Sequence, residues 1–240
     1  PAISGVIDRR ILVNFHIDPE ALARVLPAPF RPKVIRGHAI GGICLIRLKD
    51  IRPSALPLPC GLRSENAAHR IAVEWEAGGE LREGVYIPRR DTDSRLNSLV
   101  GGRLFPGVHH HAAFECTEGE GRYSISMKSD DAQARIRVVA ELTDSLPPES
   151  VFPTLAEASA FFEAGSLGYS DAHAAGEFDG LELRCEGWRV EALSVSEVHS
   201  GFFADASRFP PGTVEFDCAL LMHDIQHEWH SRESLCCPGL

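Results

Sequence analysis

Apolar and polar side chains alternate with a period of two in several segments of this chain of 240 residues. The alternation is clearest from Ser64 to Trp75. Successive side chains of a β-strand point to opposite faces, so Glu65, His69 and the larger apolar residues share one face of this segment. We therefore predict an antiparallel strand whose Glu65 and His69 side chains point toward the interior.

Similar patterns along the chain predict a mainly β protein. The run over residues 37–51 is apolar enough for a strand that is buried on both faces. Many antiparallel strands with few helices are typical of a closed barrel or sandwich, and we expect residues 1–240 to form a single domain. Further strands are expected over residues 11–17, 85–88, 108–116, 122–128, 134–142 and 214–222, and a β-like segment over 181–198 could form a hairpin bent at Gly187. Loops are expected over 168–180 and 202–212.

Three short helices are expected, and each begins at a capping residue. The caps are Asp18, Asp91 and Thr154, whose side chains can accept hydrogen bonds from the first free backbone N–H groups. Thr154 and Glu157 also have the spacing of a capping box. The helices are expected to end at about Leu26, Gly101 and Gly165.

The composition excludes several classes of function. The net charge is −10 and Lys and Arg do not cluster, so we expect no nucleic-acid partner. No apolar run approaches the roughly 18 residues of a membrane-spanning helix. Seven cysteines without a CxxC spacing favour a reduced, cytoplasmic chain over a disulfide framework.

The segment that follows residue 84 contains most of the candidate chemistry. On the strand predicted over 108–116, His110 shares a face with apolar residues, whereas His109 and His111 point the other way. His110 is then either a core histidine bonded to a backbone carbonyl or a functional imidazole in a pocket. Glu65 is either a paired carboxylate at a strand end or an acid or base with a raised pKa.

Positive charge gathers in the same part of an otherwise acidic chain. The planar guanidinium group of arginine suits a carboxylate, so Arg103 is a candidate for holding a substrate anion. Arg89, Arg90 and Arg95 add to the local positive charge. The arginines of this segment could instead form structural pairs with Asp91 and Asp93.

Two groups of histidines raise the possibility of a metal site. On a helix, His223, His227 and His230 would share a face and could ligate a metal. We expect a solvated tail there instead, because the stretch is short and polar and directly follows a strand. His109 and His111 could ligate a metal if the two faces of their strand were reversed. We expect neither a metal nor a cofactor.

Much of the chain resembles the uncharacterised YqjF-like family, which is similar to the acetoacetate decarboxylase superfamily. The resemblance implies a β-barrel-like fold with an internal pocket. The segments that carry it are ILVNFHIDPEALARVLPAPFRPKVIRGHAIGGICLIRLKDIRP, SENAAHRIAVEW, REGVYIPRRDTDSRLNSLVGGRLFPGVHHH and DCALLMHDIQHEW.

The resemblance also has consequences for mechanism. In acetoacetate decarboxylases a Gly-Arg-Glu motif leads, after a Gly and a Pro, to a lysine pair whose first member forms a Schiff base with the substrate ketone. Here Gly102 and Arg103 match the start of the motif, Leu104 replaces its glutamate, and His110 and His111 replace the lysine pair. Imidazole cannot form the iminium, so we do not expect classical decarboxylase activity.

Other positions follow from the same resemblance. Glu65 resembles the strand glutamate that lines the decarboxylase pocket. Among the lysines, Lys128 is expected on a solvent face and Lys33 in a loop, while Lys49 stays open as an alternative nucleophile.

These patterns favour an enzyme-like pocket, of lyase or hydrolase type, for a small carbonyl or carboxylate compound. His110 and Glu65 would exchange protons, and Arg103 would hold an anionic group of the substrate. One alternative is a non-catalytic ligand-binding or sensing barrel, and a weaker one is a metal-dependent barrel. The sequence is compatible with a homo-oligomer. Further contacts to the substrate are expected from His69, Arg90, Arg95 and His111.

Overall fold

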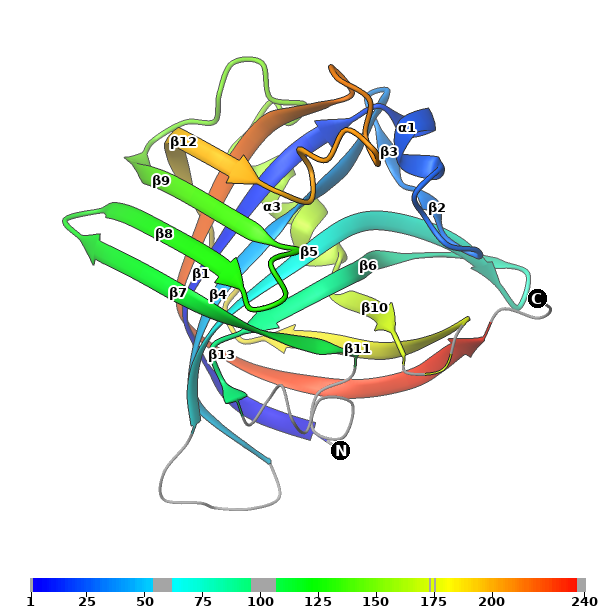
Figure 1. Ribbon diagram of the computed structural model, residues 1–240, viewed down its shortest axis with the longest axis horizontal. Coiled ribbons are helices and arrows are strands. Elements are labelled where there is room, and N and C mark those ends of the chain that lie inside the picture. Colours follow the sequence, from blue (N-terminus) through cyan, green and yellow to red (C-terminus); the bar gives the residue numbers. More distant parts are fainter. Residues whose placement is uncertain (1, 54–61, 96–106, 173, 175, 237–240) are drawn as a thin grey trace.

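The structure is a computed structural model that describes residues 2–53, 62–95, 107–172, 174 and 176–236. Strands form most of it (Figure 1). The strands are β1 (Ala2–Ile17), β2 (Arg31–Pro32), β3 (Val34–Ile35), β4 (His38–Pro53), β5 (Leu62–Ala77), β6 (Glu80–Thr92), β7 (His109–Gly119), β8 (Arg122–Ser129), β9 (Arg135–Thr143), β10 (Leu167–Asp171), β11 (Glu177–Cys185), β12 (Glu191–Ser200) and β13 (Val214–Cys236). The described helices are α1 (Pro19–Ala23) and α3 (Leu155–Ala164).

The strand pairings close two rings that share one wall. The wall consists of β13, β1, β4, β5 and β6, which are hydrogen-bonded in that order. One ring continues from β6 through β7, β8, β9 and β12 back to β13, and the other continues through β10 and β11 back to β13. Closure removes unpaired strand edges. The predicted mainly β fold is confirmed, and the closed rings are compatible with the predicted barrel.

Two wall strands belong to both rings because their two halves have different neighbours. Residues 219–221 of β13 pair with β12, whereas residues 227–236 pair with β11. In β6, residues 85–87 pair with β10 and residues 90–92 pair with β7. One part of β6 and of β13 therefore belongs to the first ring, and another part of the same strand belongs to the second.

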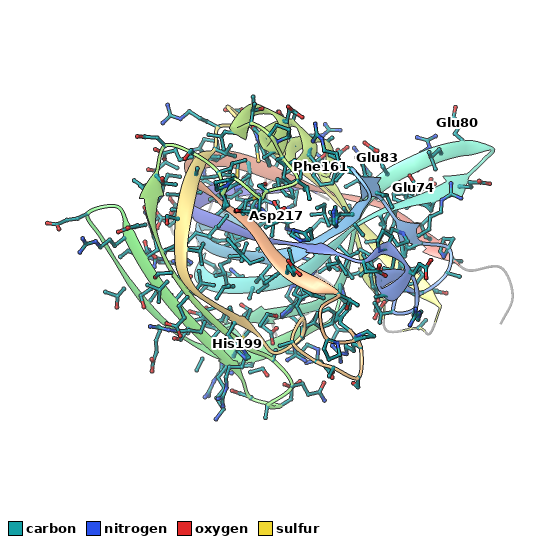
Figure 2. The ribbon with its side chains drawn as sticks, turned by 90° about the horizontal axis from the view of Figure 1, so that it is seen from above. Glu74, Glu80, Glu83, Phe161, His199 and Asp217 are labelled. Atoms are coloured by element: carbon teal, nitrogen blue, oxygen red, sulfur yellow. The ribbon has the colours of Figure 1, made fainter. Side chains whose placement is uncertain are left out.

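Both faces of the wall are buried. On the face called the inner face here, Ile43 of β4 belongs to a core shared with β8 and β9. On the opposite face, called the α3 face, Cys44 belongs to a second core that contains Phe162 of α3. Figure 2 shows Phe161 of α3 and His199 of β12 on opposite sides of the molecule. The predicted burial of β4 on both faces is confirmed.

Both described helices begin at their predicted caps. The Asp18 carboxylate accepts a hydrogen bond from the N–H of Ala21 at 2.7 Å, and Thr154 Oγ1 accepts one from the N–H of Glu157 at 3.2 Å. The first helix is shorter than predicted and ends at Ala23. Neither of these helices combines the length and the apolar character that crossing a membrane requires.

Asp91 does not cap a helix, so that prediction is wrong. The strand β6 continues through Asp91 to Thr92, and both side chains are buried. Pairing with β5 on one side and β7 on the other outweighs the local capping preference at this position. The rest of the predicted helix falls on residues 96–106, outside the described residues.

Two expectations for the segment after α3 are also wrong. Residues 168–180 are not a loop, because β10 and β11 place Tyr169 and Phe178 in the inner core. The chain turns at Gly187, whose φ is 73°, but β11 and β12 do not pair with each other as a hairpin. Local alternation predicts β structure for β11 and β12 but does not identify the strands with which they pair.

The last three histidines lie on a strand rather than in a solvated tail, so that prediction is wrong as well. The strand β13 continues through them because β1 and β11, which are distant in sequence, pair with it on both sides. His227 is buried, and His223 Nε2 lies 2.9 Å from the hydroxyl oxygen of Tyr123. The helical spacing of His223, His227 and His230 therefore does not gather them on one face.

Candidate functional site

A bulge in β6 determines which way its polar residues point. Between the cross-strand pairs Tyr86–Ile71 and Arg89–His69, β6 has one residue more than β5. An extra residue changes the phase of the side-chain alternation. Arg89 consequently follows Tyr86 onto the inner face, and Arg90 points to the α3 face.

A row of residues across three strands forms the centre of the candidate site. Ala67, Asp91 and His110 are cross-strand neighbours on β5, β6 and β7. Glu65 and His69 lie two residues to either side of Ala67 and share its inner face. The predicted inward direction of Glu65 and His69 is confirmed, and His110 lies on the same side of the sheet.

His110 contacts a carboxylate from the turn between β8 and β9. Its Nδ1 atom lies 3.3 Å from Asp131 Oδ2. The side chain of His110 is 36% exposed, so solvent reaches the imidazole. Among the described residues, Nε2 of the ring makes no hydrogen bond. The partner of this histidine is thus a side-chain carboxylate and not a backbone carbonyl.

Asp131 is held in its ionised form. Its carboxylate accepts hydrogen bonds from Arg89 Nη2 at 2.9 Å and Nη1 at 3.1 Å, from Ser129 Oγ at 2.6 Å and from the N–H of Gln133 at 3.0 Å. Burial alone would raise the pKa of Asp131, but these hydrogen bonds bring it well below its ordinary value. A charged carboxylate orients a neighbouring imidazole and stabilises its protonated form.

Arg89 connects Asp131 to the buried Asp91. Its Nη2 donates to Asp91 Oδ1 at 2.7 Å, and its Nε donates to Asp91 Oδ2 at 3.0 Å. Burial lowers the pKa of Arg89, but the bonds to both carboxylates raise it above its ordinary value. Pairing between an arginine of this segment and Asp91 was one of the two alternatives left open by the sequence.

Glu65 belongs to a separate ionic cluster. Its carboxylate accepts a hydrogen bond from Arg9 at 2.6 Å and another from Arg47, and both arginines also contact Glu118. Two arginines and two glutamates balance in charge, so Glu65 has the geometry of a paired carboxylate. Within the described part of the chain, no contact joins Glu65 to His110.

His69 is fully buried beside the rings of Phe202 and Phe203, whose centroids lie 5.0 Å and 6.1 Å away. Neither ring nitrogen has a hydrogen-bond partner among the described residues. Burial, together with the positive charges of Arg89 and Arg208, lowers the pKa of His69 to about 3. The imidazole is therefore neutral at physiological pH.

The other predicted substrate contacts lie outside this cluster. Arg90 faces the α3 face, as the bulge requires. His111 Nδ1 lies 2.7 Å from the carboxylate of Asp130, and Arg95 is exposed. Arg103 lies outside the described residues.

None of the three lysines is placed to form a Schiff base with a substrate bound beside His110. Lys33 Nζ lies 2.8 Å from a carboxylate oxygen of Glu83, Lys49 forms an ion pair with Asp8, and Lys128 is exposed on β8. In the described part of the chain, no three side chains of His, Cys, Asp or Glu are grouped so that they could hold a metal ion.

Sequence reasoning missed Asp131 and the hydrogen bonds that Arg89 donates to it. The turn that contains Asp131 is distant in sequence from His110, and no spacing rule connects them. The only available signal for Arg89 was Pro88, because proline within a strand is typical of a bulge or an edge.

Solved structures with the same architecture are acetoacetate decarboxylase-like proteins. The acetoacetate decarboxylase of Legionella pneumophila has a TM-score of 0.60 and 13% identity, over 95% of this chain and 84% of that one. The enduracididine biosynthesis enzyme MppR complexed with pyruvate has a TM-score of 0.58 and 12% identity, over 98% and 89%. An acetoacetate decarboxylase-like enzyme from Sphingomonas wittichii RW1 has a TM-score of 0.56 and 14% identity, over 99% and 92%. The chain therefore has the acetoacetate decarboxylase-like fold.

The sequence assigns the chain to a particular family within proteins of this fold. Residues 7–210 match the family model DUF2071, described as an uncharacterised conserved protein. The chain belongs to this family. A search of curated proteins finds no match. The resemblance to an uncharacterised family is thus confirmed, and so is the acetoacetate decarboxylase-like fold that it implies.

Proposed function

We propose that the protein is an enzyme that transfers a proton on a small carbonyl compound bearing a carboxylate, with His110 as acid and base. The contact between His110 Nδ1 and the ionised Asp131 carries this proposal. An imidazole that contacts a carboxylate and is partly exposed to solvent is suited to general acid–base catalysis.

The likeness to a pyruvate-bound structure supports a 2-oxo acid as the substrate class. MppR, which has the same fold, is complexed with pyruvate in one structure and with a pyruvate condensation product in another. In this chain, Arg103 remains the candidate for holding the carboxylate of such a substrate. A small 2-oxo acid would present the carbon next to its carbonyl group to His110.

The proposed step is removal and return of a proton. His110 Nε2 takes a proton from the carbon next to the carbonyl group, and the electrons of the C–H bond form the enolate, whose charge lies on the carbonyl oxygen. Asp131 stabilises the resulting imidazolium ion. Reversal of the step returns a proton to carbon. No lysine is needed, in keeping with the pairing of Lys33 and Lys49 to carboxylates.

Exchange of the pyruvate methyl protons for deuterium in D₂O tests this step without knowledge of the full reaction. We expect the protein to accelerate loss of the methyl proton NMR signal. His110→Gln should reduce exchange to the buffer rate, and Asp131→Asn should slow it by about 10-fold to 100-fold because the imidazole loses its charged partner.

His111→Gln is the matched control, because His111 pairs with Asp130 on the other face of β7. It should exchange at the rate of the unmodified protein. Exchange that persists in His110→Gln would show that His110 is not the base. Pyruvate binding without any exchange would favour the ligand-binding or sensing barrel.

A further inference from the structure

A cavity of about 100 Å³ lies on the α3 face of the wall, beneath α3. A smaller cavity of about 50 Å³ adjoins it, and Arg90 and Trp229 line both. Most of the lining is apolar, and it includes Leu12, Ile46, Phe162 and Trp188. The bulge in β6 turns Arg90 into this space and away from the inner core.

Three arginines line the larger cavity, and none of them has a carboxylate partner in the part of the chain that the structure describes. They are Arg10 of β1, Arg70 of β5 and Arg90 of β6. Among the described residues, none of the three forms an ion pair, and each donates a hydrogen bond to a neutral acceptor. The acceptors are Cys44 Sγ at 3.0 Å from Arg10, Asn14 Oδ1 for Arg70 and Ser170 Oγ at 3.0 Å from Arg90.

Two of these guanidinium groups are costly to bury. Burial lowers the pKa of Arg70 to about 10 and that of Arg90 to about 10, so both remain protonated at neutral pH. Arg70 Nε is buried and has no hydrogen-bond partner in the described part of the chain. Its guanidinium group lies over the ring of Phe162, 4.7 Å from the centroid. A buried charge without a counter-ion destabilises a protein.

We propose that this cavity binds a small organic carboxylate with an apolar body, whose negative charge is held by Arg70 and Arg90. The planar fork of a guanidinium group matches a carboxylate through paired N–H donors. The apolar lining suits the rest of the ligand. The two adjoining cavities together approach the roughly 150 Å³ of a protein cavity that holds benzene, so the ring of a single-ring acid can occupy them while its carboxylate lies against the arginines.

This site is distinct from the proposed catalytic site. Arg70 directly follows His69 in β5, and Arg90 directly follows Arg89 in β6. In each pair the first residue faces the inner core and the second faces α3. A ligand on the α3 face therefore does not touch His110, and either site can be removed by mutation without the other.

The cavity opens beside the ion pair of Lys33 and Glu83. Both residues belong to its lining, and Glu83 is exposed. The ring of Phe161 lies 4.8 Å from Lys33 Nζ at the same opening. Figure 2 shows Phe161 and Glu83 close to each other, in keeping with the contact that each makes with Lys33. The charges of Lys33 and Glu83 offset each other at this opening, so the attraction for an anion comes from the arginines inside the cavity.

Benzoate is the probe for this site, and the neutral isostere benzamide is its control. Binding is measured by calorimetry and by tryptophan fluorescence, because Trp188 and Trp229 line the cavity. We expect benzoate to bind at millimolar concentrations or below, to raise the thermal midpoint, and to bind at least 10-fold more tightly than benzamide.

Arg70→Met and Arg90→Met should each weaken benzoate binding at least 10-fold, because each removes a charge-assisted hydrogen bond. Both variants should unfold at or above the temperature of the unmodified protein, since a buried unpaired charge is removed. Arg122→Met is the matched control, because Arg122 is exposed on β8, and it should bind benzoate normally. His110→Gln should also bind normally, which separates this site from the proposed catalytic one.

Three results would overturn the proposal: no binding of benzoate to the unmodified protein, equal binding of benzamide, or unchanged binding in folded Arg70→Met and Arg90→Met. If either methionine variant fails to fold, Arg70→Lys and Arg90→Lys keep the charge and lose the planar fork. These lysine variants should bind benzoate several-fold more weakly, and unchanged affinity in both would equally contradict the proposal.

Discussion

At the scale of single residues, neighbours in sequence lie in different electrostatic surroundings. His69 is neutral because burial and two arginines disfavour its proton, whereas Arg70 keeps its charge in the core on the other face. In the unfolded chain His69 would have its ordinary pKa of 6.5. Below that pH the unfolded state binds a proton that the folded state excludes, so the folded state loses stability as the pH falls.

His69→Leu should therefore make stability less dependent on pH. The difference between pKa values of 6.5 and about 3 predicts that His69 removes about 2 kcal/mol of stability between pH 7 and pH 5. Urea unfolding of both proteins at the two pH values measures this loss. His199→Leu is the control, because its side chain is exposed on β12. An identical pH-dependent loss in His69→Leu would refute the assignment.

For single residues, the period-two alternation of the sequence predicts which face of the strand a side chain lies on, and nothing further. The inward direction of Glu65 and His69 follows from the period of β5 alone, and the structure confirms it. Neither the arginine partners of Glu65 nor the contact of His110 with Asp131 has a local signal, because each joins strands distant in sequence. The side chains were assigned to the correct face, but their partners were not identified.

At the scale of elements, local capping explains where α3 begins, and tertiary contacts explain where it lies. Thr154 Oγ1 accepts the hydrogen bond of the predicted cap. The segment before it is fixed by Asp217 of β13, which accepts hydrogen bonds from Ser150 Oγ at 2.7 Å and the N–H of Val151 at 2.8 Å. Only the first of these interactions could be predicted, since its two residues are three apart in the chain.

Thr154→Ala should lower the free energy of unfolding by about 1 kcal/mol, because the N–H of Glu157 loses its acceptor. The measurement is the denaturant midpoint, with the slope of the transition unchanged. Thr154→Ser retains the hydroxyl group and should be close to the unmodified protein. If alanine and serine at this position have the same midpoint, the cap does not contribute to stability.

The bulge in β6 is the element-scale feature that sequence alternation could not anticipate. Simple alternation from Tyr86 would place Arg90 inward and Arg89 outward, which is the reverse of the structure. The substrate contact expected of Arg90 rests on local positive charge alone, which gives no sign of the face to which this side chain points. Pro88 lies within the bulge, where a missing N–H interrupts the pairing least.

At the scale of the whole molecule, the shared wall links the two cores. Its strands contribute alternate residues to each core, so damage to one core should weaken the other. We propose on this ground that residues 1–240 unfold as one domain. A mainly β chain was predictable, but the division into two rings depends on pairings between distant strands.

Ile125→Ala tests this cooperativity. Ile125 is fully buried in the inner core, and its truncation should cost about 2–5 kcal/mol. Tryptophan fluorescence, to which Trp188 and Trp229 on the α3 side and Trp75 in the inner core contribute, should report the same lowered midpoint as circular dichroism. Leu142→Ala, at a partly exposed position on β9, should have a much smaller effect. Two separate transitions in Ile125→Ala would contradict unfolding as one unit.

The shared wall also restricts how a chain of this kind can change length during evolution. An inserted residue in β5 would reverse every following side chain, so His69 and Arg70 would exchange cores at the same time. The turn at Gly78 and Gly79 has positive φ angles and open space around it, so insertions there leave both cores intact. The bulge is different again, because loss of its extra residue would restore regular pairing and keep Arg89 on its present side. Lineages can therefore vary in the turns and at the bulge, while the wall strands between them keep their length.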